Sequence, residues 1–347
     1  MYKVSVIGAT GYVGAEITRL LYEHRFFDIS VLTSRSFKGD LFSDIYPSMK
    51  GMVDIVLEDM DIPSLCSSSD FVVTALPHGV SSRVVPMLLA KGARVIDHSG
   101  DYRFRNINTY LKAYKTDHSS PEYIEEAVYG LPELYREKIR ETNLVSNPGC
   151  YPTCSILGMA PLLLNHIVSP EGMIISAASG VSGAGRSEKT DLSFCETDST
   201  FKPYNPVGHR HTPEIEQEFS LLYGQEISLT FTPHLIPMKR GMLCTIYADL
   251  IDSSIGISSI ENIYRDAYDD EYFVRFLGHG RLPQTKSVSG SNFIDISFDI
   301  NRDTGKIIIF SALDNLGKGA ASQAVQCLNI MAGFEEEEGL KKPSLYI

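Results

Sequence analysis

The chain has 347 residues, of which 43% are hydrophobic and 21% charged, as is typical of a globular protein with about two domains. No apolar run reaches the roughly 18 residues that span a bilayer, and the first residues lack a signal-peptide pattern, so we expect a cytoplasmic protein with no membrane partner. The net charge of −12 argues against nucleic-acid binding, which needs a basic surface, although a local arginine cluster can still bind an anionic substrate.

Strands and helices alternate through roughly the first 100 residues of the chain. The pattern predicts strands at 3–7, 28–33, 71–77 and 94–99, with helices directly after the first strand and at 81–92. This alternation is typical of a parallel sheet covered by helices on both faces. The expected fold class of the first domain is therefore α/β, of the Rossmann-type doubly wound kind that binds dinucleotides.

The pattern changes after about residue 150. A helix at 153–164 is followed by strand-like runs at 172–181, 227–238, 241–250, 293–301 and 306–315, and by a last helix at 321–334. Strands in succession with few helices predict an α+β domain with a mixed sheet. Because the last helix is expected to pack near the first domain, the predicted domains are 1–148 with 318–347, and 149–317.

Three glycines follow the first strand, at positions 8, 11 and 14. This spacing is a variant of the dinucleotide fingerprint, in which Gly8 permits a tight turn, Gly11 lets the main chain approach a pyrophosphate, and Gly14 allows close helix packing. The N–H groups of the helix start then face the phosphates. The alternative is a glycine-rich turn without a ligand. Further contacts to the cofactor are expected from Thr10, Tyr12 and Val13.

The second strand ends in Thr33-Ser34-Arg35-Ser36, where an NAD-binding domain usually carries an acid for the ribose hydroxyl. Ser34 and Arg35 suit a 2′-phosphate instead, because arginine makes charge-assisted bonds to phosphate. The predicted cofactor is therefore NADP, and the alternative is a solvated loop arginine. Leu76, Pro77 and Gly79 follow the third strand and are expected to contact the same cofactor.

One of the six cysteines has a distinctive setting, in Ser146-Asn-Pro-Gly-Cys150-Tyr-Pro-Thr-Cys154. Pro148 and Gly149 indicate a sharp turn, and Pro152 suits the first turn of a helix. Cys150 is therefore expected at a helix N-terminus, which favours the nucleophilic thiolate form. The alternative is a buried structural cysteine, the role we expect for Cys154. No metal site is predicted, because no spacing supplies further ligands.

Histidine is the expected proton shuttle, because it titrates near neutral pH. In Gly-His209-Arg210-His211 the two histidines alternate with arginine, so an extended strand would turn both to one face. An irregular or helical segment would not have that geometry. His234 is a third candidate, and Glu214 is a candidate to orient a histidine.

Anion-binding residues are predicted in several segments. The loop from Ser179 to Arg186 is rich in glycine and serine, so it offers many N–H donors to an anion. Arg103 follows the fourth strand, at the edge of the sheet where open α/β folds bind ligands. Surface ion pairing is the alternative for each arginine. The residues assigned to substrate are Ser99, Arg103, Asn147, Ser179, Gly180, Arg186, Glu214 and Arg240.

Six motifs occur in a characteristic order: GATGYVG (8–14), NPGCYPT (147–153), SGVSGAGR (179–186), GHRHTPEIEQ (208–217), FTPHLIPMKRG (231–241) and LDNLGKGAA (313–321). Together they closely resemble the N-acetyl-gamma-glutamyl-phosphate reductase family over almost the whole chain. Aspartate-semialdehyde dehydrogenase and glyceraldehyde-3-phosphate dehydrogenase are wider relatives.

The resemblance implies an enzyme of arginine biosynthesis in which Cys150 forms a thioester from an acyl phosphate, phosphate leaves, and NADPH reduces the thioester to an aldehyde. It implies a catalytic histidine in GHRH, for which we expect His209 first and His211 second. It also implies that Asn315 binds the nicotinamide carboxamide, with Ser182 and Gly183 as further cofactor contacts, and that the chain forms a homo-oligomer, a dimer or a tetramer. The alternatives are a lysine-pathway reductase of an N-modified aminoadipyl phosphate and a non-catalytic NADP-binding regulator.

Overall fold

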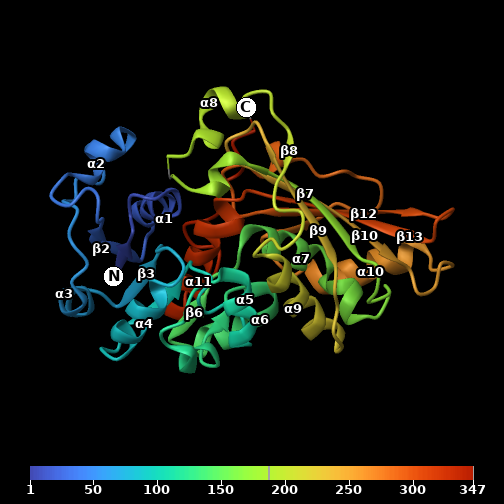
Figure 1. Ribbon diagram of the computed structural model, residues 1–347, viewed down its shortest axis with the longest axis horizontal. Helices are drawn as coiled ribbons and strands as arrows, with labels where there is room; N and C mark the ends of the chain where they lie inside the picture. The colour runs from blue at the N-terminus through green and yellow to red at the C-terminus, as the bar shows by residue number, and fades with distance from the viewer. Residues whose placement is uncertain (187, 347) are drawn as a thin grey trace. The chain divides into compact units, whose positions relative to one another are not determined.

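The computed structural model describes residues 1–186 and 188–346 (Figure 1). Two compact units divide the chain: Met1–Pro148 with Ala320–Lys341, and Gly149–Gly319 with Lys342–Ile347. The chain therefore crosses from the first unit to the second directly before Gly149 and Cys150. Among the described residues, no helix has the length and apolar character needed to cross a membrane.

The sheet of the first unit is parallel throughout, with the described strands in the order β2-β1-β3-β4-β6-β5. The strands are β1 (Tyr2–Ile7), β2 (Phe27–Thr33), β3 (Phe71–Thr74), β4 (Arg94–Asp97), β5 (Val128–Tyr129) and β6 (Leu144–Ser146). Because β2 and β3 lie on opposite sides of β1, the strand order reverses at β1, and the carboxyl ends of β1 and β3 form the usual ligand-binding edge.

Helices cover this sheet and close the core of the first unit. They are α1 (Tyr12–Tyr22), α2 (Phe42–Ile45), α3 (Ile62–Ser68), α4 (Ser81–Leu89), α5 (Ile107–Tyr114), α6 (Pro132–Glu141) and α11 (Ser322–Ala332). Helix α4 buries Val84, Val85 and Leu88 in a core shared with Val72 of β3 and Val95 of β4. Helix α11, from the end of the chain, packs on α1, α6 and β4, so the first unit is discontinuous in sequence.

The second unit holds a mixed sheet with the described strands in the order β11-β12-β13-β10-β7-β9-β8. The strands are β7 (Ile174–Gly180), β8 (Lys202–Pro203), β9 (Thr230–Ile236), β10 (Met242–Asp249), β11 (Val274–Phe276), β12 (Ile294–Asn301) and β13 (Lys306–Leu313). Strand β10 pairs antiparallel with β7 and β13, whereas β7 and β9 run parallel. The two sheets confirm the predicted fold class, a doubly wound α/β unit joined to an α+β unit.

One face of the mixed sheet carries helices. They are α7 (Cys150–Leu164), α9 (Thr212–Tyr223) and α10 (Ile257–Tyr268), and the short α8 (Phe194–Thr197) lies in the segment before β8. Helix α7 packs on β10 and β13 and also contacts α9 and α10. The hydroxyl of Tyr264 on α10 donates to the carbonyl of Gly158, 2.7 Å away. These contacts fix α7 within the second unit.

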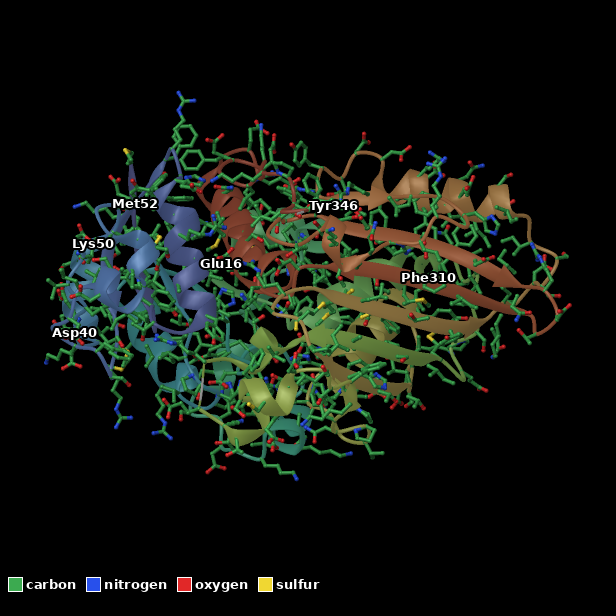
Figure 2. All side chains as sticks on the ribbon, turned by 90° about the horizontal axis from the view of Figure 1, so that it is seen from above. Glu16, Asp40, Lys50, Met52, Phe310 and Tyr346 are labelled. Atoms are coloured by element: carbon green, nitrogen blue, oxygen red, sulfur yellow. The ribbon has the colours of Figure 1, made fainter. Side chains whose placement is uncertain are left out.

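The opposite face of the mixed sheet presents a band of half-buried apolar side chains. Phe310, labelled in Figure 2, pairs in register with Thr245, and Ile308 pairs with Tyr247. Leu243 continues the band along β10 and pairs with Ala178 of β7. These side chains are of intermediate exposure, in contrast to the fully buried residues that alternate with them.

Candidate active site

The turn between β1 and α1 requires two of its three glycines. Gly8 has a left-handed φ of 83°, and a β-carbon there would lie 2.5 Å from the carbonyl oxygen of Ala75. A β-carbon on Gly14 would lie 2.4 Å from the carbonyl oxygen of Gly8. A β-carbon on Gly11 would meet only that same oxygen, at 3.6 Å. The helix therefore packs tightly on the turn, while the surface above Gly11 stays open to a phosphate.

The start of α1 fits an anionic group. No acidic residue lies in its first turn, so the unpaired N–H groups and the positive end of the helix dipole face outward without a competing carboxylate. Thr10 shares a 2.8 Å hydrogen bond with Ser34, and its carbonyl accepts from the hydroxyl of Tyr46. Tyr12 is exposed and Val13 is half-buried at the helix start.

The end of β2 brings a hydroxyl and a guanidinium beside this turn. Ser34, the first residue after β2, is buried and bonded to Thr10. Arg35 follows it and is exposed. Ser34 thus ties the end of β2 to the glycine turn, and Arg35 is directed toward solvent beside it.

The segment after β3 is held by a carboxylate that the sequence analysis did not select. Asp101 accepts from the N–H of Gly79 at 2.8 Å and from the N–H of Ser82 at 2.8 Å, so it caps the start of α4. Leu76 is half-buried and Pro77 is exposed in this segment. The aspartate lies in the motif that also contains Ser99 and Arg103, but only the folded chain brings it to Gly79.

Three residues predicted to bind substrate gather where β4 and β6 end. The buried guanidinium of Arg103 donates to the carbonyl oxygens of Asn147 and His98, at 2.8 and 2.9 Å. Ser99 donates to Asp97, a buried carboxyl whose pKa is raised mainly by desolvation. The main-chain N–H of Asn147 donates to the carbonyl of Asp97 at 2.8 Å. Arg103 therefore fixes the segment that leads into Cys150.

Helix α7 begins at Cys150, as the sequence predicted, and Gly149 is its N-cap residue, with φ −70° and ψ 153°. Cys150 is half-buried, whereas Cys154 is fully buried and its Sγ donates to the carbonyl oxygen of Ser311. The main chain of Gly319 lies against Cys150, because a β-carbon there would lie 2.7 Å from Cβ of Cys150. A partly accessible thiol at a helix N-terminus suits nucleophilic attack.

The GHRH segment is not a strand. It is a turn that leads into α9, and His211 is the residue before the helix. Of the geometries that the sequence left open, the irregular one is present, and His209 and His211 are both buried while Arg210 is exposed. The two imidazole centroids are 5.0 Å apart, and the Nδ1 atom of His209 accepts from the main-chain N–H of His211 at 3.1 Å.

The two histidines have different surroundings. Nε2 of His211 lies so close to the turn before Cys150 that a β-carbon on Gly149 would be 2.5 Å from it. For His209, burial and then the charge of Arg210 lower the pKa to about 4. His209 is therefore neutral at physiological pH, and its Nδ1 acts as the acceptor that holds His211. His234 donates from Nδ1 to the carbonyl of Ala177, a contact within the sheet.

Aromatic rings surround His209. Tyr151 and Phe231 have ring centroids 5.8 and 5.3 Å from its imidazole, and Tyr204 lies at 5.5 Å. The hydroxyl of Tyr204 donates to that of Tyr151 at 3.0 Å, and burial raises the pKa of Tyr204 to about 12. Both phenols are therefore neutral near pH 7. Tyr204 was missed by the sequence analysis, because it lies outside every recognised motif.

Glu214 lies in the first turn of α9 and is fully buried. Its Oε1 atom accepts from the main-chain N–H of Gly149 at 2.9 Å. Two side chains at the start of α9, those of His211 and Glu214, therefore contact the turn that precedes Cys150.

The loop after β7 is fixed by Asn315. The Nδ2 atom of Asn315 donates to the hydroxyl of Ser182 at 2.9 Å, and its Oδ1 accepts from the N–H of Gly241 at 2.8 Å. Ser179 is buried, and a β-carbon on Gly180 would lie 2.8 Å from the carbonyl oxygen of Lys239. Gly183 is also close to Asn315, since a β-carbon there would lie 3.5 Å from Nδ2.

Two arginines flank this loop. Arg186 is exposed. Arg240 donates from Nε to Asp314 at 2.8 Å, and Asp314 also accepts from the N–H groups of Leu316 and Gly317. Asp314 was missed although it adjoins Asn315 in a motif already recognised. Its full burial gives it a fixed position, and through it the guanidinium of Arg240 is held in place.

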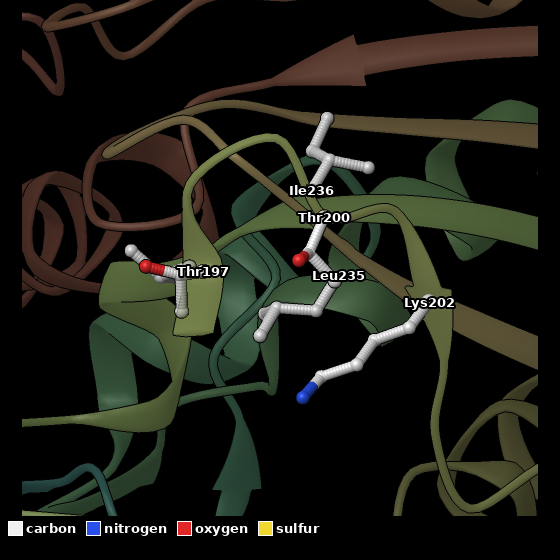
Figure 3. A pocket seen from close by; sticks show the side chains of 6 residues that line it. Thr197, Thr200, Lys202, Leu235 and Ile236 are labelled. Atoms are coloured by element: carbon white, nitrogen blue, oxygen red, sulfur yellow. The ribbon is translucent and has the colours of Figure 1, made fainter. Parts of the chain in front are cut away.

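A small pocket lies beside the same loop (Figure 3). In this view the side chains of Lys202 and Leu235 extend from two paired strands, and Thr197 comes from α8. The pocket is lined by Val181, Thr197, Thr200, Lys202, Leu235 and Ile236.

In the described part of the chain, no cluster of three or more His, Cys, Asp or Glu side chains is arranged to hold a metal ion.

Two family models match the chain, one for each part of the fold. Residues 3–142 match the semialdehyde dehydrogenase NAD-binding domain, and residues 150–315 match the semialdehyde dehydrogenase dimerisation domain. Solved structures agree at the level of the fold. Aspartate semialdehyde dehydrogenase II from Vibrio cholerae, complexed with ASA, aligns with a TM-score of 0.72 at 18% identity, over 96% of this chain and 98% of that one.

A second solved structure gives the same result. Aspartate semialdehyde dehydrogenase with NADP from Candida albicans has a TM-score of 0.70 at 15% identity, over 96% of this chain and 98% of that one. The fold, the glycine turn and the cysteine at the start of α7 define a two-domain oxidoreductase of the semialdehyde dehydrogenase class, with a domain for a nicotinamide dinucleotide.

Sequence relatives narrow the class. N-acetyl-gamma-glutamyl-phosphate reductase from Acetivibrio thermocellus is 51% identical over 349 residues, covering 100% of both chains. The enzyme of the same name from Desulfotalea psychrophila is 48% identical over 348 residues, again covering 100% of both. The chain belongs to the N-acetyl-gamma-glutamyl-phosphate reductase family, as its six motifs predicted.

Proposed function

We propose that this chain reduces N-acetyl-gamma-glutamyl phosphate to N-acetyl-glutamate 5-semialdehyde and phosphate, with NADPH as the reductant. The observation that carries the proposal is the arrangement at the start of α7. Cys150 is the first helical residue, and Nε2 of His211 lies against the glycine that precedes it. A thiol and an imidazole at one turn are the nucleophile and proton carrier that acyl transfer through a thioester needs.

The first half of the proposed reaction uses Cys150. Its thiolate attacks the acyl-phosphate carbonyl, a C–S bond forms, and the bond from carbon to the phosphate oxygen breaks. Phosphate leaves with that electron pair. The N-terminus of α7 supports the negative charge on sulfur before the attack, and the half-buried position of Cys150 leaves it accessible.

The second half returns the thiolate. When bound, NADPH would supply the hydride that reduces the thioester carbon. His211 gives a proton to the oxygen of the resulting thiohemiacetal and takes it back as the C–S bond breaks and the aldehyde leaves. We assign this role to His211 rather than His209, the first choice from the sequence. His209 has a lowered pKa, and its Nδ1 already accepts from the main chain of His211.

Arg240 is the proposed anchor for an anionic group of the substrate. Asp314 holds its Nε, and the side chain of Arg240 is about a quarter exposed, so its charge can act on a carboxylate or phosphate bound beside it. Ser179, Gly180 and Arg186 are proposed to contribute from the neighbouring loop. In the first unit, Ser99, Arg103 and Asn147 remain proposed substrate residues.

The cofactor is proposed to be NADP rather than NAD. Arg35 is exposed directly after β2 and beside the glycine turn, and Ser34, bonded to Thr10, supplies a hydroxyl. The remaining proposed contacts in the first unit are Gly8, Gly11, Tyr12, Val13, Gly14, Leu76, Pro77 and Gly79. Ser182, Gly183 and Asn315 are the proposed contacts in the second unit.

The enzyme is proposed to be a homo-oligomer that associates through the half-buried face of the mixed sheet. The band of Phe310, Ile308, Tyr247 and Leu243 lies within residues 150–315, which match the dimerisation domain of the family. A second copy of the chain would bury this apolar band.

The cytoplasm is the proposed location, because a reducing compartment keeps the nucleophilic thiol free.

The test is the reverse reaction, phosphate-dependent oxidation of a semialdehyde with NADP. Acetylated glutamate semialdehyde should be oxidised at least about tenfold faster than its non-acetylated form and than the N-modified aminoadipyl analogue. Alkylating Cys150 with iodoacetamide should abolish the activity. A preference for the aminoadipyl substrate would support the lysine-pathway alternative. No phosphate-dependent oxidation of any of the three would favour a non-catalytic role.

A further inference from the structure

Helix α9 begins where the nucleophile's turn lies, and its first turn carries Glu214. The carboxylate is fully buried and accepts the N–H of Gly149 at 2.9 Å. A buried carboxylate is costly unless hydrogen bonds or positive charge compensate it. Here the N-termini of two helices compensate the charge, because Glu214 belongs to the first turn of α9 and its carboxylate accepts a hydrogen bond from the N-cap residue of α7.

The contact acts on the geometry of the site. Gly149 has no side chain with which to cap α7, and no side-chain cap of that helix is present. The N–H of Gly149 is instead fixed from α9, by the same turn that carries His211. The imidazole and the thiol therefore belong to two helices that are joined by the Glu214–Gly149 hydrogen bond.

We propose that Glu214 is a positioning residue for the reaction: by accepting the N–H of Gly149, it holds Cys150 at the distance from His211 that proton transfer needs. This inference rests on the proposed function, in which Cys150 and His211 act together. It assigns Glu214 to the main chain behind the nucleophile rather than to the substrate.

The same helix offers a matched control. Glu218 lies one turn farther along α9 and is also fully buried, and its Oε1 accepts from the side chain of Gln217 at 2.9 Å. Glu218→Ala therefore removes a buried carboxylate from the same helix as Glu214→Ala does. A general loss of packing should affect both variants alike.

The experiment compares Glu214→Ala, Glu214→Gln and Glu218→Ala in the full-length protein. We expect kcat to fall about 10²-fold in Glu214→Ala with KM within about threefold of the parent, because a small misplacement of reacting groups costs that much. Glu214→Gln keeps an oxygen acceptor for Gly149, so its kcat should stay within about fivefold of the parent. Glu218→Ala should keep the kcat of the parent within about the same factor.

A second readout does not depend on the substrate. Iodoacetamide should alkylate Cys150 at least about fivefold more slowly in Glu214→Ala than in Glu214→Gln, because both lack the charge and only the latter keeps an acceptor for the N–H of Gly149. Equal alkylation rates in these two variants, or equal kcat in Glu214→Ala and Glu218→Ala, would overturn the positioning role. Failure of the proposed function would show differently, as activity in the parent that survives complete alkylation of Cys150.

Discussion

The imidazole of His211 lies directly against the α-carbon of Gly149, so that a methyl group at this position would be 2.5 Å from Nε2. Gly149 has an ordinary extended conformation, with φ −70° and ψ 153°, that any residue can adopt. The glycine is therefore required by the close approach of the histidine and not by backbone strain. This approach places a titratable ring one residue from Cys150.

Gly149→Ala tests that contact. The added β-carbon should push His211 away from the nucleophile and lower kcat by about 10²-fold, because reacting groups tolerate little displacement. Gly256→Ala is the control. Gly256 is the N-cap of α10, with φ −74° and ψ 147°, and a β-carbon there meets only Ser259 Oγ at 3.7 Å. Steady-state rates of the two variants should differ by at least about tenfold, and similar rates would contradict the contact.

Separate asparagine variants test the assignment of the acid–base role. His211→Asn should lower kcat by about 10² to 10⁴-fold, the usual contribution of a positioned proton carrier. His209→Asn should cost about tenfold at most, because it removes one supporting hydrogen bond worth about 1 kcal/mol. The pH profiles of kcat/KM would be compared with that of the parent. A larger loss of kcat in His209→Asn than in His211→Asn would instead assign the acid–base role to His209.

His209 should also make stability depend on pH. Its pKa is lowered from 6.5 to about 4 by burial and then by Arg210, so the unfolded chain binds more protons between these values. The stabilisation is present above pH 6.5 and is lost as the pH falls toward 4, by up to about 3 kcal/mol. Between pH 7.5 and pH 5, the free energy of unfolding measured with urea should fall more for the parent than for His209→Gln. Equal losses would mean that the imidazole is not kept neutral by the fold.

Arg35→Asp tests the cofactor preference. Replacing the exposed guanidinium beside the glycine turn should raise KM for NADPH about 10 to 100-fold, through the loss of charge-assisted bonds to the 2′-phosphate, and change KM for NADH by much less. Lys91→Asp is the control, because it makes the same change in charge on an exposed residue just before β4. Lys91 lies at the amino ends of the strands, away from the carboxyl ends where the glycine turn lies. Equal effects of Arg35→Asp on the two cofactors would argue against a 2′-phosphate site.

Phe310→Asp tests the proposed assembly. A carboxylate in the half-buried band of the mixed sheet would be desolvated by a second copy of the chain, so the variant should elute as a smaller species than the parent. Light scattering after size-exclusion chromatography measures the mass. An unchanged mass in a variant with parental circular dichroism would exclude this face as the interface.

Much of the fold follows from local sequence. The glycine turn at Gly8, the alternation of elements and the helix start at Cys150 depend on residues close together in the chain. The GHRH segment does not follow from local sequence, because its turn is set by the packing of α9 against α7. A single-residue alternation also cannot distinguish a strand from a turn that buries the same side chains. The sequence therefore left the strand and the irregular geometry of this segment as alternatives.

The supporting residues were the hardest to predict. Glu214 meets Gly149 and Asp314 meets Arg240 across separations of 65 and 74 residues, so no local spacing indicates either pair. Tyr204 reaches Tyr151 in the same non-local way, across 53 residues. The helix start at Cys150 was predictable because it has a local signal, whereas these supporting contacts are assembled only by folding.

The role of Cys150 is tested most directly by identifying the residue that the substrate acylates. The enzyme would be mixed with N-acetyl-gamma-glutamyl phosphate without NADPH, quenched in acid, digested and analysed by mass spectrometry. We predict an acyl group on the peptide that contains Cys150, absent from Cys150→Ser and removed when NADPH is added before the quench. Acylation of another residue, or full turnover by Cys150→Ser, would contradict this role of Cys150.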